Sequence, residues 1–569
     1  MGLPSEKIHA CPNDCMLYRD KNESLHCFSV CYFSDAGDAE KLTWHFDDLE
    51  GDGMLKHPAD SPQWKFIDGK FPDFAKEKRN LRLALSTDGF NPFGSLSSTY
   101  STWPVVFITY NLSPTLCMKR RYMMLSLLIS GPRQAGNDID VYLAPLIDDL
   151  KMLWETGVEV FDAHGNEKFN LKAMFFCIIQ DFPAYGNISG YTVYGEAACP
   201  ICMEQFKGQW LYGSGKYVFD NHRVFLPCDH HYRYMKKAFN GEQEFRGRPK
   251  FMSSVEVFEK IKDIQIIFGK KHQNLFLNKG LRSELHAVDK ERGQKYLPPA
   301  AYTLSRKEKI ELYESLARVK VPQGYSSNIR NLVNMETLKL VGLKSHDCHV
   351  LMQQLLPVAI RSILPKNVRH AIIRLCLFFN AIYSKVIDPK DLKALEDDIV
   401  IILCQLEMYF PPWFFDIMVH LTVHLVREIR FCGPVYLRAQ WAFERKMRTY
   451  QGYVTNAYRP EGCNAERLFY EEVLAYASEF LVNAMKIGLP VSRHSGRMDG
   501  QGTLGRKQLD MSYDNWHKAH SFILHNEDEV APYVERHMRY LKKYNPRANQ
   551  KALAKKHNRS FIAWFKVQQ

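Results

Sequence analysis

The sequence predicts an α/β core with a mixed sheet, a large and mostly α-helical insertion that interrupts this core, and a basic helical C-terminus. Three observations lead to this fold class. Strand-like apolar runs surround one amphipathic helical segment between residues 76 and 185. Helical periodicity then dominates residues 346–480. From Arg536 to Lys566 there are ten lysines and arginines and no acidic residue.

The composition is that of a globular protein with a polyanionic partner. Of the 569 residues, 46% are hydrophobic and 24% are charged, which is an ordinary balance for folded domains. The net charge of +12 favours a partner rich in negative charge. Apolar runs such as Ile399–Cys404 are far too short to span a membrane, so we expect no membrane partner. The N-terminus has no apolar signal core.

The length predicts several domains, and we expect five regions. They are a Cys-containing N-terminal region, the α/β core with a CxxC motif, a partial insertion or linker, a helical domain, and a linker with the basic helical segment. In this order they would occupy residues 1–75, 76–240, 241–345, 346–480 and 481–569.

The core elements follow one another in an informative order. Residues 81–86, 103–110 and 123–130 have strand character. Apolar residues between 138 and 157 then recur on one helical face, and residues 169–180 return to strand character. Three strands, a helix and a fourth strand make up the front half of a ribonuclease-H-like fold.

Two aspartates each follow one of these strands. Asp88 comes after the first strand, and Asp181 comes after the fourth. Carboxylates at the ends of adjacent central strands lie close enough to share Mg²⁺ or Mn²⁺, which prefer hard oxygen ligands. The alternative is that each aspartate only forms a turn, because Asp is common before Gly and Pro in turns.

Cysteines occur in close pairs, which favour zinc over disulfides in a chain without a secretion signal. Cys199 and Cys202 form a CxxC motif that suits one half of a tetrahedral zinc site. Candidate partners follow downstream, namely His222, Cys228, His230 and His231. The looser pairs near the N-terminus allow a small zinc knuckle or free thiols, and they comprise Cys11, Cys15, Cys27 and Cys31.

The helical region supplies further candidate ligands. His420 and His424 stand at i, i+4 on one helix face, where they can hold one metal or pack as core histidines. Glu444 follows on an aromatic and basic helix. It is a candidate third metal carboxylate, and the alternative is a surface acid paired with Arg448.

The basic C-terminal segment predicts contacts with the phosphates of a polyanionic partner, or alternatively a solvated pair of amphipathic helices. Aromatic residues interleaved with the basic ones suit base stacking, namely Tyr540, Tyr544, Phe561, Trp564 and Phe565. The candidate DNA-binding residues are Arg536, Arg539, Lys542, Lys543, Arg547, Lys551, Lys555, Lys556 and Arg559.

Long motifs give the chain a family resemblance over most of residues 7–566. They include residues 8–15 (IHACPNDC), 55–64 (LKHPADSPQW), 86–93 (STDGFNPF), 131–146, 410–416 (FPPWFFD) and 459–466 (RPEGCNAE). On these motifs the chain resembles the Tnp2-type transposase of plant CACTA (En/Spm-like) DNA transposons. Its helical half resembles the domain of unknown function that commonly follows Tnp2.

The resemblance implies a nuclear cut-and-paste transposase with a ribonuclease-H-like DDE core. Such an enzyme uses Mg²⁺ to cleave and join double-stranded DNA at transposon ends; it takes no small-molecule substrate, and a homo-oligomer is compatible with it. Asp88 and Asp181 match the first two acids. The motif order, similar to that in the catalytic subunit of V(D)J recombinase, maps the third acid onto Glu444, with Glu461 and Glu466 as rivals. The same order implies one structural zinc shared by Cys199, Cys202, His420 and His424.

The chain also departs from the family pattern. A His-Asn-Leu-Asp-Val-Met-His-like segment, usual after the CxxC region, has no counterpart between Ile264 and Gly280. The stretch after Cys31 is shortened, and the chain starts where the family is already under way. These gaps support an alternative, a truncated and catalytically inactive transposase remnant that acts at most as a DNA- or protein-binding protein.

Overall fold

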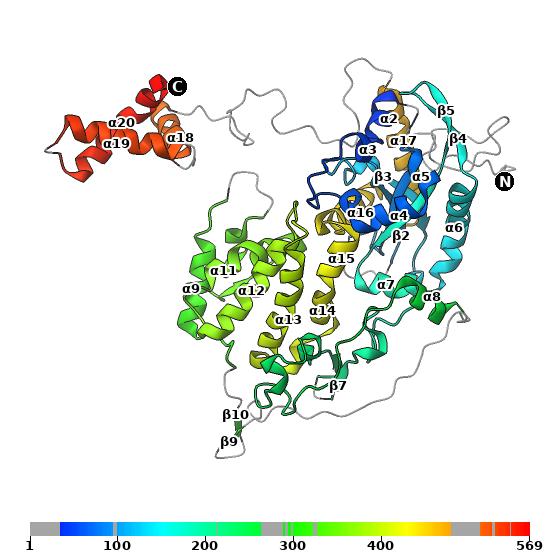
Figure 1. Ribbon diagram of the computed structural model, residues 1–569, viewed down its shortest axis with the longest axis horizontal. Coiled ribbons are helices and arrows are strands. Elements are labelled where there is room, and N and C mark those ends of the chain that lie inside the picture. The colour runs from blue at the N-terminus through cyan, green and yellow to red at the C-terminus, as the bar shows by residue number, and fades with distance from the viewer. Residues whose placement is uncertain are drawn as a thin grey trace. The chain divides into compact units, whose positions relative to one another are not determined.

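The computed structural model describes residues 33–262, 288–290, 294–296, 300–479 and 512–568, apart from gaps at 34, 95–99, 213, 322–326, 526–529 and 547. The chain forms two compact units, a large one that ends at residue 490 and a small C-terminal one (Figure 1). Within the described ranges, no helix has both the length and the apolar character that a bilayer crossing needs. The expected N-terminal zinc knuckle lies outside the described residues, with all its cysteines: Cys11, Cys15, Cys27 and Cys31.

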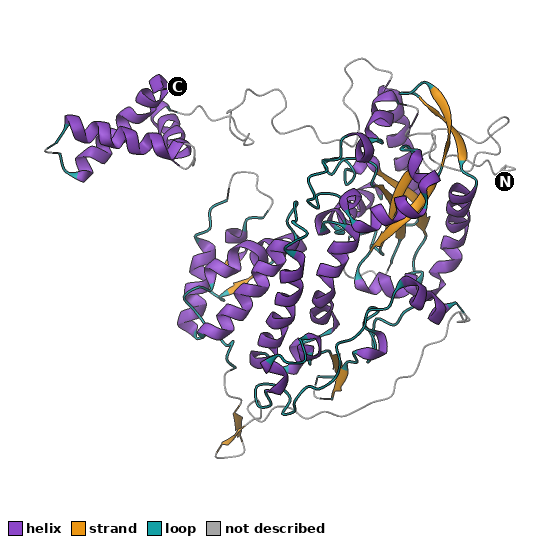
Figure 2. Cartoon of the chain, in the orientation of Figure 1, coloured by secondary structure: helices purple, strands orange, loops and turns teal. Residues whose placement is uncertain are grey.

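A four-stranded mixed sheet forms the core of the large unit (Figure 2). Its strands lie in the order β3-β2-β1-β6, with β1 antiparallel to β2, β2 antiparallel to β3, and β6 parallel to β1. Every residue of β1 and β2 is buried, as expected for central strands covered on both faces. The prediction of an α/β core with a mixed sheet is confirmed. The bounds are Leu81–Thr87 for β1, Trp103–Thr109 for β2, Met123–Ile129 for β3 and Ala173–Ile179 for β6.

The predicted fourth strand over residues 169–180 is wrong in one respect, because the chain makes two strands there. Strand β5 (Glu167–Leu171) pairs with β4 (Val158–Asp162) as a separate hairpin, and β6 begins only afterwards. Lys172 is the junction, since its carbonyl accepts a hydrogen bond from Leu81 N at 2.9 Å and its N–H donates to Asn80 Oδ1 at 2.7 Å. A continuous stretch of strand character therefore hides a change of partner strand.

Helices cover the sheet. The predicted amphipathic segment forms α6 (Ile139–Glu155), which packs against β6 and β3 with Leu143, Leu146 and Leu153 buried. At the N-terminal end come short helices, and the guanidinium of Arg82 on β1 stacks over Trp64 of one of them at 4.4 Å. These are α2 (Ala36–Lys41), α3 (Trp44–Asp47), α4 (Pro62–Lys70) and α5 (Pro72–Lys76).

The remainder of the large unit is mostly helical, as predicted. A second hydrophobic cluster joins the loop around the CxxC motif to α12, α13 and α15. The helices after the sheet are α7 (Phe182–Ser189), α8 (Ser254–Ile261), α9 (Arg306–Ala317), α10 (Ser345–Val350), α11 (Leu356–Ala359), α12 (Lys366–Ile382), α13 (Leu392–Tyr409), α14 (Ile417–Leu421), α15 (Leu425–Cys432), α16 (Trp441–Tyr453) and α17 (Pro460–Glu479). Short hairpins pair β7 (Gln209–Leu211) with β8 (Lys216–Val218), β9 (Val288–Lys290) with β10 (Gln294–Tyr296), and β11 (Val333–Asn334) with β12 (Lys339–Leu340).

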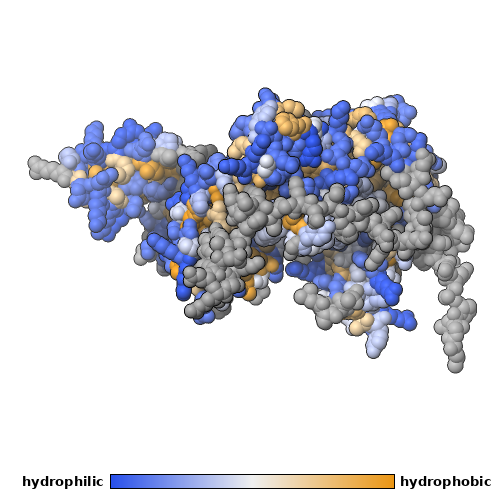
Figure 3. All heavy atoms as spheres, turned by 90° about the horizontal axis from the view of Figure 1, so that it is seen from below, coloured by the Kyte–Doolittle hydropathy of each residue, from blue (hydrophilic) through white to orange (hydrophobic). Residues whose placement is uncertain are grey.

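The small C-terminal unit consists of α18 (Tyr513–His525), α19 (Ala531–Tyr544) and α20 (Gln550–Gln568). Its apolar cluster includes Val530, Phe561 and Phe565. At the left of Figure 3, the visible face of this unit is mostly hydrophilic, with a hydrophobic strip between the polar groups. The three helices agree with the prediction of a helical C-terminus.

Candidate active site and metal centre

The parallel pairing of β1 and β6 brings the two predicted aspartates to the same end of the sheet. Ser86 pairs with Ile179, and Asp88 and Asp181 each follow two residues later. Neighbouring strands lie about 4.8 Å apart, so the two residues leave the sheet side by side. Asp88 Oδ1 accepts a hydrogen bond from Gly89 N at 2.7 Å. Asp181 Oδ1 accepts one from Ala184 N at 2.8 Å and thereby caps α7, so its turn-forming role is real as well.

Glu444 comes from α16, near the C-terminal end of the helical region. It lies in the first turn of α16, where it is exposed. The same helix buries Lys446, whose Nζ donates to the Met123 carbonyl oxygen at the start of β3. Gln451 Nε2 donates to Asn91 O at 2.8 Å, in the loop that follows Asp88. These contacts hold α16 against the start of β3, which lies at the opposite end of the sheet from Asp88, and against the loop that follows Asp88.

The three acids share one electrostatic environment. Burial raises the pKa of Asp88, the charge of Asp181 raises it further, and Glu444 adds to the effect, so that the pKa reaches about 7 against the opposing hydrogen bond from Gly89. A carboxyl group responds in this way when like charges stand close to it. Asp181 and Glu444 thus act on Asp88 from two other elements, and the parallel register of β1 and β6 places Asp88 beside Asp181.

The two rival acids occupy other surroundings. Glu461, in the first turn of α17, accepts hydrogen bonds from Thr102 Oγ1 at 2.8 Å, Gly131 N at 3.0 Å and Tyr100 Oη at 3.1 Å. Burial opposes these bonds, but together they lower the pKa of Glu461. Glu466 is exposed, and its charge acts on Cys463. Neither acid contributes to the raised pKa of Asp88.

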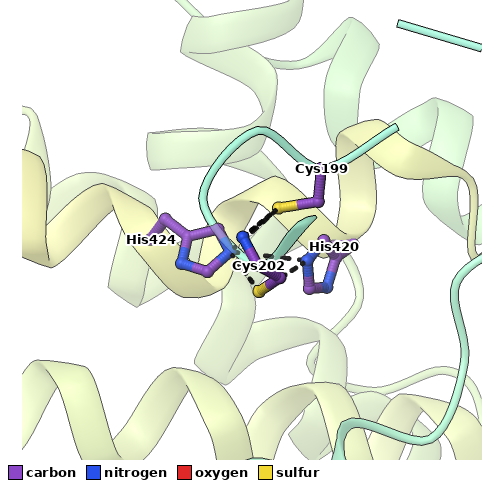
Figure 4. A group of neighbouring side chains, drawn as sticks. All are labelled: Cys199, Cys202, His420 and His424. Atoms are coloured by element: carbon purple, nitrogen blue, oxygen red, sulfur yellow. Dashed lines mark hydrogen bonds between the residues drawn. The ribbon is translucent and has the colours of Figure 1, made fainter. Parts of the chain in front are cut away.

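The four predicted zinc ligands come together in one buried cluster. Cys199 and Cys202 lie on the loop after the sheet, and His420 and His424 lie on and just after α14, with all four side chains pointing toward one another (Figure 4). Their sulfur and nitrogen atoms all lie within 4.8 Å of one another. Cys202 N also donates to Cys199 Sγ at 3.3 Å, which folds the CxxC turn around the cluster.

The distances within this cluster fit a tetrahedral zinc ion. His424 Nε2 lies 3.4 Å from Cys199 Sγ and 3.3 Å from Cys202 Sγ, and His420 Nε2 lies 3.7 Å from Cys202 Sγ and 3.4 Å from His424 Nε2. Zinc binds sulfur at about 2.3 Å and nitrogen at about 2.0–2.1 Å. Tetrahedral ligands at these lengths stand roughly 3.6 Å apart for S···N and roughly 3.4 Å for N···N.

The protonation chemistry of the cluster also suits a cation. Burial lowers the pKa of His420 to about 4, so its imidazole is neutral and has a lone pair to donate. A hydrogen bond from Cys202 is the main influence that lowers the pKa of Cys199, and the two imidazoles act in the same direction. The same bond raises the pKa of Cys202, so Cys199 is the thiolate of the pair before a cation binds. Thiolate and neutral imidazole are the forms in which these side chains bind zinc.

The remaining candidates near the CxxC motif are not ligands of this cluster. His222 contacts His420 from behind, with Nε2 at 3.3 Å from His420 Nδ1. His230 Nδ1 accepts a hydrogen bond from Tyr232 N at 3.2 Å, and His231 and Cys228 are exposed. Sequence reasoning missed the partner of His222, which is Glu407 on α13, and only its position among apolar residues could have drawn attention to it.

The basic residues of the C-terminal unit lie on its surface. The predicted residues in α19 and α20 are all exposed: Arg536, Arg539, Lys542, Lys543, Lys551, Lys555, Lys556 and Arg559. Arg547 lies outside the described residues. The stacking role predicted for Phe561 and Phe565 is wrong, because both rings are buried in the core of this unit. Tyr540 and Tyr544 are exposed and remain available for stacking.

Comparison with known proteins gives two matches. Residues 52–264 match the family model described as transposase family tnp2, and this range contains Asp88, Asp181 and the CxxC motif. Residues 382–488 match the domain of unknown function DUF4218, which contains His420, His424 and Glu444. No curated protein matches the chain. The two matches, in this order along one chain, support a Tnp2-type transposase.

Proposed function

We propose that this chain is a DDE-type DNA transposase, which cleaves transposon-end DNA and joins the freed 3′ end to a target. The observation that carries the proposal is the parallel register of β1 and β6, which brings Asp88 and Asp181 to one end of the sheet, where burial, Asp181 and Glu444 all raise the pKa of Asp88. Structural acids are usually paired with cations or hydrogen-bond donors, as Glu461 is with its three donors. Carboxylates held together without a basic partner are typical of divalent-cation sites.

The topology of the sheet supports this proposal. Three antiparallel strands followed by a helix and a strand parallel to the first are the expected beginning of a ribonuclease-H-like core. The first and fourth of these strands carry Asp88 and Asp181. The match to the tnp2 transposase family covers the same segment. The finer family assignment, to CACTA-type elements of plants, rests on the sequence motifs and belongs to this proposal.

Asp88, Asp181 and Glu444 would hold two Mg²⁺ or Mn²⁺ ions. Bound there, such ions activate the attacking oxygen and stabilise the leaving oxygen of a phosphodiester. With a pKa of about 7, Asp88 is about half protonated at neutral pH in the metal-free protein. Because a cation binds the ionised carboxylate, Asp88 must release this proton first. Metal affinity and cleavage should therefore rise as the pH increases through 7.

We propose a structural role for the Cys/His cluster. Cys199 and Cys202 precede the helical region, and His420 and His424 lie near its end, just before the helix that carries Glu444. A zinc ion held by these four residues would tie the two ends together. The exposed basic residues of the C-terminal unit would bind DNA backbone phosphates without reading sequence, and we place the protein in the nucleus, where its DNA is.

The proposal is tested by strand cleavage with the full chain and supercoiled plasmid DNA. We expect nicking that requires Mg²⁺ or Mn²⁺ and disappears in Asp88→Ala, Asp181→Ala and Glu444→Gln. Glu466→Gln is the matched control, since this acid is exposed and lies away from Asp88. DNA binding that weakens with salt, without any metal-dependent cleavage, would instead establish the inactive DNA-binding remnant.

A further inference from the structure

We propose that His222 and Glu407 are positioning residues for the zinc site, because they fix the tautomer in which His420 can bind the metal. This inference rests on the zinc ion proposed above and not on the DNA chemistry. Neither residue belongs to the cluster of four ligands. Both are nonetheless buried directly behind it, His222 being fully buried and Glu407 being 5% exposed.

A chain of short contacts links Glu407 to the cluster. Glu407 Oε1 lies 2.6 Å from His222 Nδ1 and also accepts the backbone N–H of His222 at 2.8 Å. His222 Nε2 lies 3.3 Å from His420 Nδ1. His420 then turns its other nitrogen, Nε2, toward Cys202 and His424. The order of groups is thus carboxylate, imidazole, imidazole and ligand cluster.

The carboxylate determines where each proton of this chain lies. An ionised carboxylate only accepts hydrogen bonds, so His222 must carry its proton on Nδ1. The Nε2 of a neutral His222 is then an acceptor, and His420 must donate to it from Nδ1. This leaves the lone pair of His420 on Nε2, the atom that faces the cluster. The opposite tautomer would put a proton where the metal belongs.

Glu407 borders a cavity of about 30 Å³, whose lining surface is mostly apolar but includes the polar side chains of Asn221, Asn240 and Asp220. This space is large enough for about one water molecule. The aromatic ring of Phe206 meanwhile stacks on His420 at 4.3 Å and holds the plane of the imidazole. Orientation thus comes from stacking, and proton placement comes from the Glu407–His222 pair.

The other histidine ligand lacks such support. Among the described residues, His424 Nδ1 is buried and has no hydrogen-bond partner. The two histidines are therefore unequal, and the Glu407–His222 pair serves His420 alone. Hydrogen-bonded partners of metal-binding histidines typically change metal affinity by tenfold to a hundredfold when they are removed.

The test compares zinc affinities of full-chain variants by competition with a chelator. We expect His222→Phe, which keeps an aromatic ring in the site, to weaken zinc binding by about tenfold to a hundredfold. The matched control His231→Phe removes an exposed histidine nearby and should leave the affinity unchanged. Co²⁺ absorption should still report two sulfur ligands in His222→Phe, because the thiols remain.

Two results would overturn the inference. One is a zinc affinity of His222→Phe within twofold of the unaltered chain. The other is an unaltered chain that binds no zinc, which would remove the zinc site and this inference together, whatever the outcome of the cleavage assay. Should His222→Phe not fold, Glu407→Gln decides, since it conserves shape, removes the charge and is expected to weaken zinc binding by several-fold. An unchanged affinity of Glu407→Gln would then count against the inference.

Discussion

The two candidate centres of the large unit differ in how their groups interact before any ion is bound. Burial and the charges of Asp181 and Glu444 raise the pKa of Asp88 to about 7. The Cys/His cluster is fully buried and made of donors that differ in kind. The first centre is partly open, as the proposed DNA chemistry requires, whereas the second is closed, as structural zinc sites are. Exposure and charge thus separate the proposed catalytic centre from the proposed structural one.

The largest expected effect comes from breaking the closed centre. Cys199→Ser should release the zinc and lower the free energy of unfolding by about 3 kcal/mol or more, because metal binding at such sites is coupled to folding. Metal content and thermal unfolding of the purified chain measure both effects. Cys228→Ser, at an exposed cysteine, is the control. A Cys199→Ser chain that still holds one equivalent of zinc would contradict the assignment.

A second variant tests Glu461, which accepts several hydrogen bonds, in contrast to Asp88, whose pKa is raised by burial and by neighbouring acids. Glu461→Ala removes an acceptor of three hydrogen bonds and should cost about 2 kcal/mol at pH 7. The pKa of Glu461 is lowered, so its contribution is present above the unfolded value of about 4.5 and is lost as the pH falls through the lower folded value. The difference from the unaltered chain in urea unfolding should therefore shrink in acid.

The control for this experiment is Glu466→Ala, which should be neutral because the side chain is exposed. If Glu461→Ala abolished metal-dependent cleavage but left stability unchanged, Glu461 and not Glu444 would be the third acid of the site.

Replacing Asp88 should have the opposite effect on stability. Asp88→Asn should stabilise the metal-free chain by roughly 1 kcal/mol above pH 7, a figure kept small because the side chain is partly exposed. Since the folded pKa is raised above 3.8, ionisation costs more in the folded state, and the gain should grow between pH 4 and pH 7. Urea unfolding with EDTA measures it, and a destabilised Asp88→Asn chain would count against charge repulsion.

The smallest effect concerns a histidine cluster without thiols, in the C-terminal unit. His557 lies 2.8 Å from His525 and 2.9 Å from His537, between ring nitrogens. Burial lowers the pKa of His557 to about 4, and the charges of His537 and His525 lower it as well. As the pH falls from about 6.5 to 4, the unfolded state takes up the proton first, so the unit loses stability.

Hydrogen exchange of the full chain at pH 7 and pH 5, corrected for intrinsic rates, tests this expectation. Protection of α18, α19 and α20 should fall several-fold at pH 5, and His557→Gln should remove most of this sensitivity. Equal acid sensitivity in both chains would show that other groups are responsible.

The sequence was enough to predict candidate residues that local spacing marks. Asp88 and Asp181 follow recognisable strands, and the CxxC and HxxxH motifs have the spacing of candidate metal ligands. Glu444 is a candidate from its aromatic and basic helix, but its choice as the third acid requires the family resemblance, because an acid on an exposed helix has no spacing that marks it. The placement of α16 depends on tertiary contacts, namely the burial of Lys446 and the Gln451–Asn91 hydrogen bond.

Other features could not be predicted from the sequence, because the same residue pattern occurs in two different structures. The run over residues 169–180 has strand character in both parts, so only the pairing partners reveal the break at Lys172. Aromatic residues interleaved with lysines give the same sequence pattern whether their rings stack on bases or pack in a core. Phe561 and Phe565 pack in a core. The pairing of His222 with Glu407 joins residues on separate elements and has no local signal.

The meeting of Cys199 and Cys202 with His420 and His424 has a further consequence for how this chain can change. The long segment between them begins and ends at this one cluster, although α12 and α13 within it also pack into the second hydrophobic cluster. The entropy of closing a flexible loop grows only with the logarithm of its length, by about 0.6 kcal/mol for each doubling. Changes in length outside the packed helices should therefore cost little closure entropy, while the cluster keeps the CxxC turn joined to the helical segment that precedes α16.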